Sequence, residues 1–381
     1  MTEPVTTELL FERAYLLIAE GHIENALATL DGIPAENEEQ RREVAYLRAW
    51  CSMLGGRWDE AAQFVLPQEI SGETVADIQE LGRTERRRRP YYLLVMGDVA
   101  ANLWRYEQAI QHYNQCIKLL DERRMNDLNR RIRALLGLGL CHLRTGYPAN
   151  ALEYYQQALR LCGNDTRQPN LPHVYYGLSD TYRHLNDLER ALDYGKRALN
   201  LYRERGDRHY VGRIRSLLGD IYRQMGNLPI ANESYTEALA LAMGTESIGA
   251  IFNCLTTLAE MRLQENKPED AWRYCEMALD YSPKVPRPYF LGKMYIVCGK
   301  VKEAQAKEAA GQEAQRNVEQ AISYYQQAVE TLKRTDARPE LAEAYSLLAH
   351  LQEESGRQDQ AIATWKSAYA VRAGLEDAPL V

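Results

Sequence analysis

Histidine and cysteine are the residues with which this chain could most readily do chemistry, but neither type stands at a catalytic or metal-binding spacing. The seven histidines form no His-Glu-x-x-His pair, and the seven cysteines include no Cys-x-x-Cys pair. Cys141 and His142 are adjacent, and adjacent helical side chains point about 100° apart, so they cannot act together as nucleophile and base. No glycine-rich phosphate-binding loop follows a predicted strand. We expect a protein that is not an enzyme and uses neither a cofactor nor a metal.

The composition is typical of a folded protein from a reducing compartment. Of the 381 residues 45% are hydrophobic and 26% charged, and the formal net charge of -7 gives no general electrostatic footprint for nucleic acid. The odd, scattered cysteines fit a cytoplasmic protein. The first residues lack the basic region of a signal peptide, and no apolar run is long enough to span a membrane. We therefore expect a cytoplasmic protein with no direct nucleic-acid or membrane partner.

Small residues recur at a nearly fixed interval and indicate internal repeats. One set of alanines, mostly 40 residues apart, comprises Ala26, Ala61, Ala109, Ala151, Ala191, Ala231, Ala271, Ala321 and Ala361. Five residues before them stand Gly21, Gly56, Trp104, Gly146, Asn186, Gly226, Asn266, Arg316 and Gly356. Glycine and asparagine tolerate the left-handed conformation that ends a helix. This position is therefore predicted to be a tight turn between two helices of each repeat.

The order small–x–x–Tyr, Gly, Ala, aromatic, Ala resembles the tetratricopeptide repeat. It stands in LGLCHLRTGYPANALEYYQQALRLC (138–162), LSDTYRHLNDLERALDYGKRALNLY (178–202) and LAEMRLQENKPEDAWRYCEMALDYS (258–282), and the resemblance covers about residues 6–372. It implies an all-α, right-handed αα superhelix of about nine helix-hairpin repeats. The 40-residue period is similar to the long repeats of kinesin light chains, cell-polarity adaptors and bacterial peptide sensors. These arrays bind peptides, proteins or small ligands, and their repeats are not catalytic.

Two stretches interrupt the period and suggest the domain organisation. We expect N-terminal repeats at 1–67, an irregular linker or insertion at 68–90, central repeats at 91–285 and C-terminal repeats at 286–381. The linker ends with Arg86–Arg89, which form a solvated loop, a short extra helix or a basic contact for an acidic partner. Strong helix formers at about 299–320 predict an extended helix there, either as a projecting arm or as an elongated hairpin.

In arrays of this family the first helix of each repeat lines the concave wall, and this places the candidate partner-binding residues. They are Arg133, Arg144, His173, Tyr176, Asp180, Arg183, Arg213, Asp220, Arg223, Gln224, Asn253 and Glu260. Further inward positions are Tyr91, Asp98, Asn102, His184, Ser216, Thr256, Gln264, Glu343, Ser346, His350 and Glu353. Polar groups on one helix face suit a peptide, since arginine pairs with carboxylates. Alternatively, Asp180 with Arg183 and Asp220 with Arg223 form ion pairs within their own helices.

Residues 218–242 separate packing from function most clearly. Gly219, Tyr222 and Gly226 belong to the packing pattern, whereas Asp220 and Arg223 are not required by the repeat. We expect an interaction scaffold or adaptor that binds a peptide or protein segment. The alternative is a ligand- or peptide-sensing regulatory module that acts on a transcription factor or an enzyme in trans. A third possibility is self-association through the C-terminal end, where no further capping helix follows Arg372.

Overall fold

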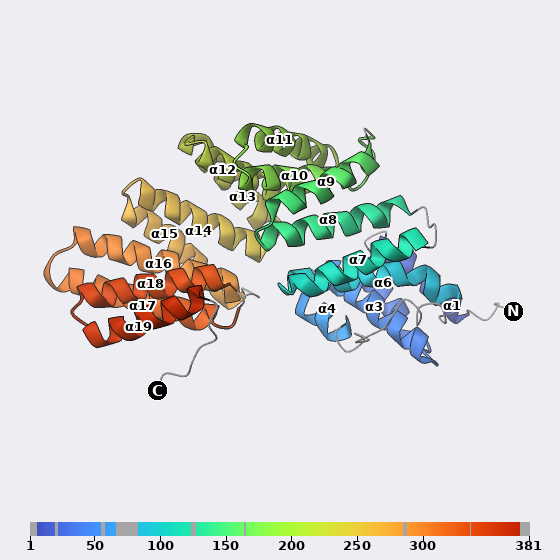
Figure 1. Ribbon diagram of the computed structural model, residues 1–381, viewed down its shortest axis with the longest axis horizontal. Coiled ribbons are helices and arrows are strands. Elements are labelled where there is room, and N and C mark those ends of the chain that lie inside the picture. Colours follow the sequence, from blue (N-terminus) through green and yellow to red (C-terminus); the bar gives the residue numbers. More distant parts are fainter. Residues whose placement is uncertain are drawn as a thin grey trace. The chain divides into compact units, whose positions relative to one another are not determined.

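A computed structural model describes residues 6–19, 22–54, 58–65, 83–122, 127–163, 165–284, 288–335 and 337–373. These residues form 18 α-helices and no strand, arranged as nine helix hairpins (Figure 1). The predicted all-α stack of helix hairpins is therefore confirmed. None of the described helices is long and apolar enough to cross a membrane.

The helices fall into two compact units, residues 1–194 and 195–381, which divide within α11. The first unit contains α1 (Thr7–Ala19), α2 (Ile23–Asp31), α3 (Glu38–Leu54), α4 (Trp58–Val65), α6 (Arg83–Asn102), α7 (Tyr106–Glu122), α8 (Leu128–Arg144), α9 (Pro148–Cys162), α10 (Leu171–His184) and the start of α11 (Leu188–Glu204). The second contains α12 (Arg208–Gln224), α13 (Leu228–Gly244), α14 (Ile248–Gln264), α15 (Pro268–Tyr281), α16 (Pro288–Glu308), α17 (Gly311–Leu332), α18 (Arg338–Glu354) and α19 (Gln358–Arg372).

A tyrosine of the second helix fills the space between successive first helices. Tyr113 of α7 is 1% exposed. A Cβ atom built on Gly97 of α6 would lie 2.5 Å from its ring, and one built on Gly137 of α8 would lie 2.3 Å from it. In the next repeat, a Cβ atom built on Gly177 of α10 would lie 2.3 Å from the ring of Tyr155. The glycines are therefore required by close helix packing, in which small residues face large ones.

The predicted turn position is confirmed in the hairpins from α6 to α15 and in the last hairpin, whereas the predicted turn residues Gly21 and Gly56 lie outside the described residues. Gly226 has φ 77°, and the non-glycine residues Trp104, Asn186 and Asn266 adopt φ 66°, 60° and 56°. A left-handed residue lets the backbone amide groups that follow the helix bond back to its last carbonyls. The Asn186 amide donates to the Arg183 carbonyl oxygen at 3.1 Å.

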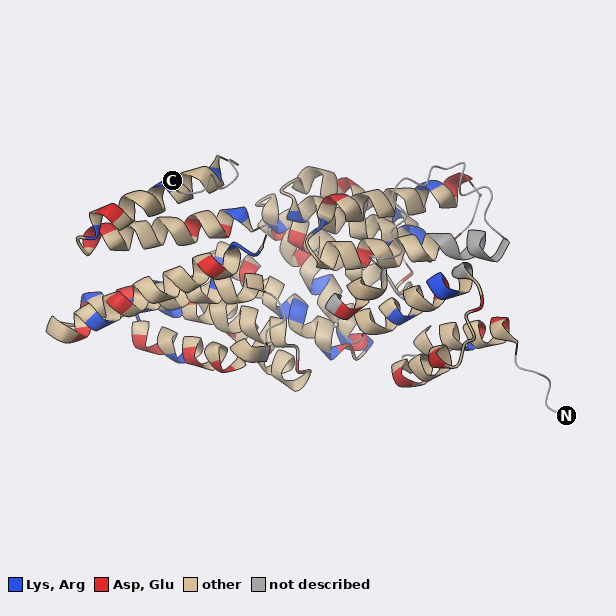
Figure 2. Ribbon diagram, turned by 90° about the horizontal axis from the view of Figure 1, so that it is seen from below, with Lys and Arg blue, Asp and Glu red and all other residues tan. Residues whose placement is uncertain are grey.

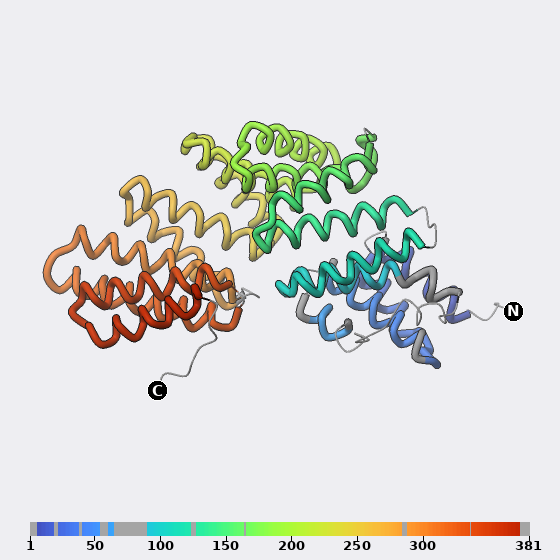
Figure 3. The backbone as a smooth tube through the Cα atoms, viewed as in Figure 1, coloured from blue at the N-terminus to red at the C-terminus, as the bar shows by residue number. Residues whose placement is uncertain are grey.

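The prediction for Arg316 is wrong, because this residue lies inside α17. The turn of this hairpin comes earlier, between Glu308 and Gly311, where Gly311 has φ 61°. Helices α16 and α17 contain 21 and 22 residues, so the hairpin is longer than its neighbours (Figure 3). The helix-forming stretch at 299–320 is thus shared between two helices of an elongated hairpin.

Most of the predicted 68–90 linker lies outside the described residues. Helix α6 begins at Arg83 and continues through Arg86–Arg89 and the buried Pro90. The arginine run therefore lies in the first turns of a long helix, not in a loop. The predicted domain boundaries at 67, 90 and 285 stay predictions.

Candidate partner-binding site

The first helices α6 and α10 of the first unit carry carboxylates in contact with arginines of α8 or of α10 itself. Figure 2 shows acidic and basic residues distributed over most of the helices. Two carboxylates, Asp98 on α6 and Asp180 on α10, each form the centre of a small polar cluster. These two clusters are the candidate site.

The Asp98 cluster joins three helices. Tyr113 of α7 donates a hydrogen bond from its hydroxyl to Asp98 Oδ1 at 2.7 Å, and Arg133 Nη2 of α8 donates to Asp98 Oδ2 at 2.8 Å. The Arg130 guanidinium lies 5.1 Å from the ring centroid of Tyr91, a cation–π contact. Both oxygens of Asp98 are thus occupied within the protein, while the Arg133 side chain remains 34% exposed.

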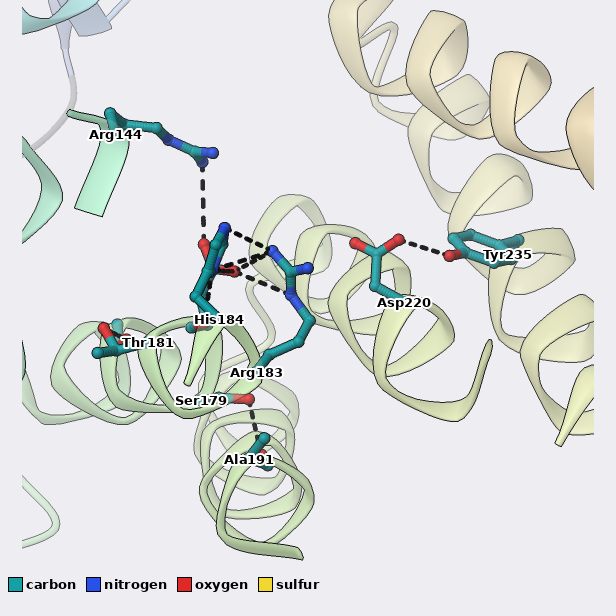
Figure 4. Close-up of polar contacts among 10 residues, drawn as sticks. Arg144, Ser179, Thr181, Arg183, His184, Ala191, Asp220 and Tyr235 are labelled. Atoms are coloured by element: carbon teal, nitrogen blue, oxygen red, sulfur yellow. Dashed lines mark hydrogen bonds and ion pairs between the residues drawn. The ribbon is translucent and has the colours of Figure 1, made fainter. Parts of the chain in front are cut away.

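The Asp180 cluster contains three nitrogen-bearing side chains around one buried carboxylate (Figure 4). Arg183 donates to Asp180 Oδ1 from Nε at 3.1 Å and from Nη2 at 2.7 Å. The His184 Nδ1 atom lies 3.3 Å from the same oxygen. Arg144 of α8 reaches Asp180 Oδ2 at 3.9 Å, beyond hydrogen-bonding distance. The Arg144 side chain is 43% exposed, against 6% for Asp180.

Electrostatics keep Asp180 ionised despite its burial. Burial alone raises the pKa of this carboxyl group, but the hydrogen bond with His184 and the charges of Arg144 and Arg183 outweigh it and hold the pKa well below its usual range. Burial lowers the pKa of Arg133, and the neighbouring Asp98 carboxylate more than compensates, so the guanidinium pKa is raised. The Asp180 carboxylate and the Arg133 guanidinium are therefore charged at neutral pH.

In the second unit the aspartate of α12 has the same kind of tyrosine partner as Asp98 of α6. Asp220 on α12 accepts a hydrogen bond from the buried Tyr235 hydroxyl at 2.6 Å. The interpretation that the fold does not require Asp220 is therefore wrong, because Asp220 is the acceptor for a tyrosine at the centre of the hairpin. Gln224 and Arg213 are exposed on the same helix, and Arg223 is half-buried.

The remaining predicted residues lie on first helices, and among them Tyr176 is close enough to Arg144 to contribute to the raised pKa of that guanidinium. His173 and Tyr176 are half-buried on α10, Asn253 is exposed on α14, and Glu260 is half-buried there. Two residues of this face, Asp180 and Thr256, are buried, with 4% and 6% of their surface exposed. The Thr256 hydroxyl donates to the Phe252 carbonyl oxygen of its own helix at 2.7 Å, which satisfies it inside the packing.

Two polar features escaped the sequence interpretation. The first is the tyrosine–aspartate hydrogen bond, although a spacing of 15 residues in both Asp98–Tyr113 and Asp220–Tyr235 would have revealed it. The second is Lys302 of α16, 9% exposed, whose ammonium lies 3.5 Å from the Trp272 ring centroid and donates to Gln305 at 2.8 Å. The burial of Lys302 is hard to predict from the sequence, because a single lysine in a helix usually faces solvent.

The described residues contain no group of histidine, cysteine and carboxylate side chains that could hold a metal ion. His142, half-buried on α8, stacks on the Tyr154 ring with centroids 5.2 Å apart, and burial lowers its pKa. Cys141 beside it is fully buried. These two residues are packing residues of the first unit.

The alternating helix hairpins, the left-handed turns and the tyrosine between successive first helices define a helical-repeat solenoid. Residues 90–164, 130–204 and 170–244 match the model of the tetratricopeptide repeat. Residues 90–244 are thus built of tetratricopeptide repeats, and the helix hairpins before and after this segment keep the same arrangement. No curated protein matches the sequence.

Solved structures with the same fold cover nearly the whole chain. The apo form of the quorum sensor NprR from B. thuringiensis is 12% identical, with a TM-score of 0.64 over 95% of this chain and 97% of that one. A Rap protein complexed with competence and sporulation factor is 14% identical, with a TM-score of 0.63 over 92% and 99%. The Rap conjugation gene regulator of plasmid pLS20, in complex with the Phr* peptide, is 14% identical, with a TM-score of 0.60 over 97% and 95%. At these identities the likeness shows the fold.

Proposed function

We propose that this protein is an interaction module that binds a peptide or protein segment, and that α6, α8 and α10 provide part of the binding surface. The observation that carries this proposal is the unequal exposure of the two signs of charge. Asp98 and Asp180 are engaged by tyrosine and arginine, whereas the Arg133 and Arg144 side chains are 34% and 43% exposed. An incoming carboxylate would therefore meet guanidinium groups, which bind it with two hydrogen bonds.

The proposed ligand is accordingly a peptide with an acidic side chain or a free C-terminal carboxylate. Arg144 is the best placed contact, because its 3.9 Å distance from Asp180 leaves its nitrogen atoms available for hydrogen bonds. The buried Asp180 and the half-buried Arg183, joined by two hydrogen bonds, hold the adjacent surface rigid. Preorganised groups of this kind reduce the entropy lost on binding.

The test is selection from a peptide library displayed on phage, followed by affinity measurements on the selected sequences as synthetic peptides. We expect acidic sequences, and we expect Arg144→Gln to weaken their binding about tenfold, the loss typical of one charge-assisted pair. Arg167→Gln is the matched control, since Arg167 is 91% exposed and lies outside the two clusters. Selection of neutral peptides that bind equally well to the Arg144 variant would contradict the proposal.

A second candidate function is a peptide-sensing regulator that acts on another protein. It is supported by the fold shared with the quorum sensor NprR and with two Rap proteins solved in complex with signalling ligands. A sensor must differ in conformation between its free and bound states, because a ligand shifts an equilibrium only through differential affinity. Small-angle scattering with a selected peptide separates the two functions. A sensor changes its radius of gyration on binding, and a rigid scaffold does not.

A further inference from the structure

In the other repeats, one face of the second helix packs against the next repeat and is buried. In α19 the residues at the same positions are exposed. Ile362, Trp365 and Tyr369 are 54%, 40% and 70% exposed. Trp365 is the fourth residue after the repeat alanine, a position at which Tyr155 and Tyr325 are 3% and 0% exposed. The α19 face is therefore a stacking surface with no described helix upon it.

The outward face of α1 shows the complementary half of the same interface. Leu9 and Leu16 are 55% and 63% exposed. Each first helix has a small residue at a fixed position of the repeat, which in α1 is Ala14. Counted from it, Leu9 occupies the position of Val174 in α10, and Leu16 occupies that of Cys141 in α8. Both of those residues are fully buried against the preceding repeat. Exposed leucines at stacking positions mark α1 as a surface that a second helix of another repeat would cover.

We propose that copies of this protein associate head to tail, with α19 of one copy stacked against α1 of the next as a tenth hairpin would stack. The charges of the two faces favour this pairing. Exposed Glu8 and Glu12 flank the leucines of α1, and exposed Lys366 and Arg372 flank the aromatic residues of α19. Opposite charges beside an apolar contact select the partner and fix the register.

The packing within the chain predicts the residue pairs of this interface. Because Tyr113 meets Gly137, the fourth residue after a repeat alanine lies opposite the second residue before the next small residue. Applied between copies, this rule puts Trp365 and Lys366 against Glu12, Tyr369 against Leu9 and Ile362 against Leu16. The position opposite the aromatic residue does not have to be glycine, since Leu347 packs in the cluster around Tyr325.

The experiment uses two variants of the full chain, each with one face blocked. Leu9→Glu with Leu16→Glu blocks α1, and Ile362→Glu with Tyr369→Glu blocks α19. All four side chains are exposed, so both variants should keep the wild-type circular dichroism and melting temperature. By analytical ultracentrifugation we expect the wild type to form species that grow with concentration, each variant alone to be a monomer, and the mixture to form a dimer that grows no further.

A charge exchange tests the register. Lys366→Glu should raise the wild-type dissociation constant about tenfold. A chain that carries both Lys366→Glu and Glu12→Lys should recover most of the loss, because the two new charges attract each other between copies.

Each other outcome overturns the proposal in a recognisable way. A wild-type protein that stays monomeric up to several hundred micromolar excludes self-association. Dimers of the variant blocked at α1 show instead that two copies of α19 pair with each other. None of these results bears on peptide binding by the surface of α6, α8 and α10. Each of the two proposals can therefore be wrong without the other.

Discussion

Helices α10 and α12 carry the same Asp-x-x-Arg sequence at the same place in the repeat, but their aspartates have different partners. Asp180 of α10 binds Arg183 of its own helix and lies near Arg144 of α8. Asp220 of α12 binds the hydroxyl of Tyr235 in α13. The residue 15 positions after Asp220 is this tyrosine, whereas the residue 15 positions after Asp180 is Gly195. A tyrosine 15 residues on therefore binds the aspartate, hydroxyl to carboxylate, as at Asp220 and also at Asp98, whereas Asp180, which lacks this tyrosine, is held by arginine.

The largest expected effect is the loss of Asp180. Replacing a buried carboxylate by an amide leaves Arg183, 17% exposed, without its counter-charge, and breaking a buried ion pair costs about 3 kcal/mol. Asp180→Asn should therefore lower the free energy of unfolding by about this amount in urea denaturation. Asp220→Asn is the matched control and should cost about 1 kcal/mol, because the amide oxygen can still accept from Tyr235. Equal losses would show that the two aspartates have the same role.

The contribution of Asp180 to the free energy of unfolding should depend on pH. The pKa of Asp180 is depressed in the folded protein, so its stabilisation is complete above the unfolded value of about 3.9 and is lost as the pH falls through the lower folded value. The difference in unfolding free energy between wild type and Asp180→Asn should be constant above about pH 5 and decrease below pH 4. A difference that decreases already near pH 6 would assign the effect to another group.

Glycine substitutions should have intermediate effects and should also differ between the two helices. A Cβ on Gly177 of α10 would lie 2.3 Å from the Tyr155 ring, and one on Gly219 of α12 would lie 2.9 Å from the Tyr235 ring. Overpacking of this kind costs about 1 to 3 kcal/mol, and Gly177→Ala should be the more destabilising by thermal denaturation. Gly249→Ala is the control, because the nearest atom of Phe290 is 3.6 Å away. It should be neutral or stabilising, as alanine is the better helix former.

The smallest predicted effect is that of the tyrosine hydroxyl. Tyr235→Phe keeps the ring that packs on Gly219 and removes the hydrogen bond to Asp220, which should cost about 1 kcal/mol. In the Asp220→Ala background the same substitution should cost much less, because the acceptor is gone. An unchanged cost in the double-mutant cycle would mean that Tyr235 and Asp220 are not coupled.

The repeat could be predicted from the sequence because its signals are local or periodic. A glycine or asparagine that ends a helix acts through its own backbone, so Asn186 and Gly226 are recognisable one at a time. Arg316 shows where prediction from the repeat period fails. Alignment of the repeats across the interval of 50 residues puts the turn of this hairpin at Arg316. In the structure the turn lies between the end of α16 and the start of α17.

The sequence by itself determined the all-α fold, the helix-hairpin repeats and the first-helix positions of Asp180 and Arg144, since periodicity fixes which face a residue occupies. Only the tertiary structure decided which charges are buried, because that depends on how closely neighbouring helices pack. Asp180 becomes the centre of a cluster once α8 brings Arg144 within 3.9 Å, and Asp220 becomes a packing residue once α13 brings Tyr235 within 2.6 Å. Side chains of the same type at the same register thus differ because their neighbours do.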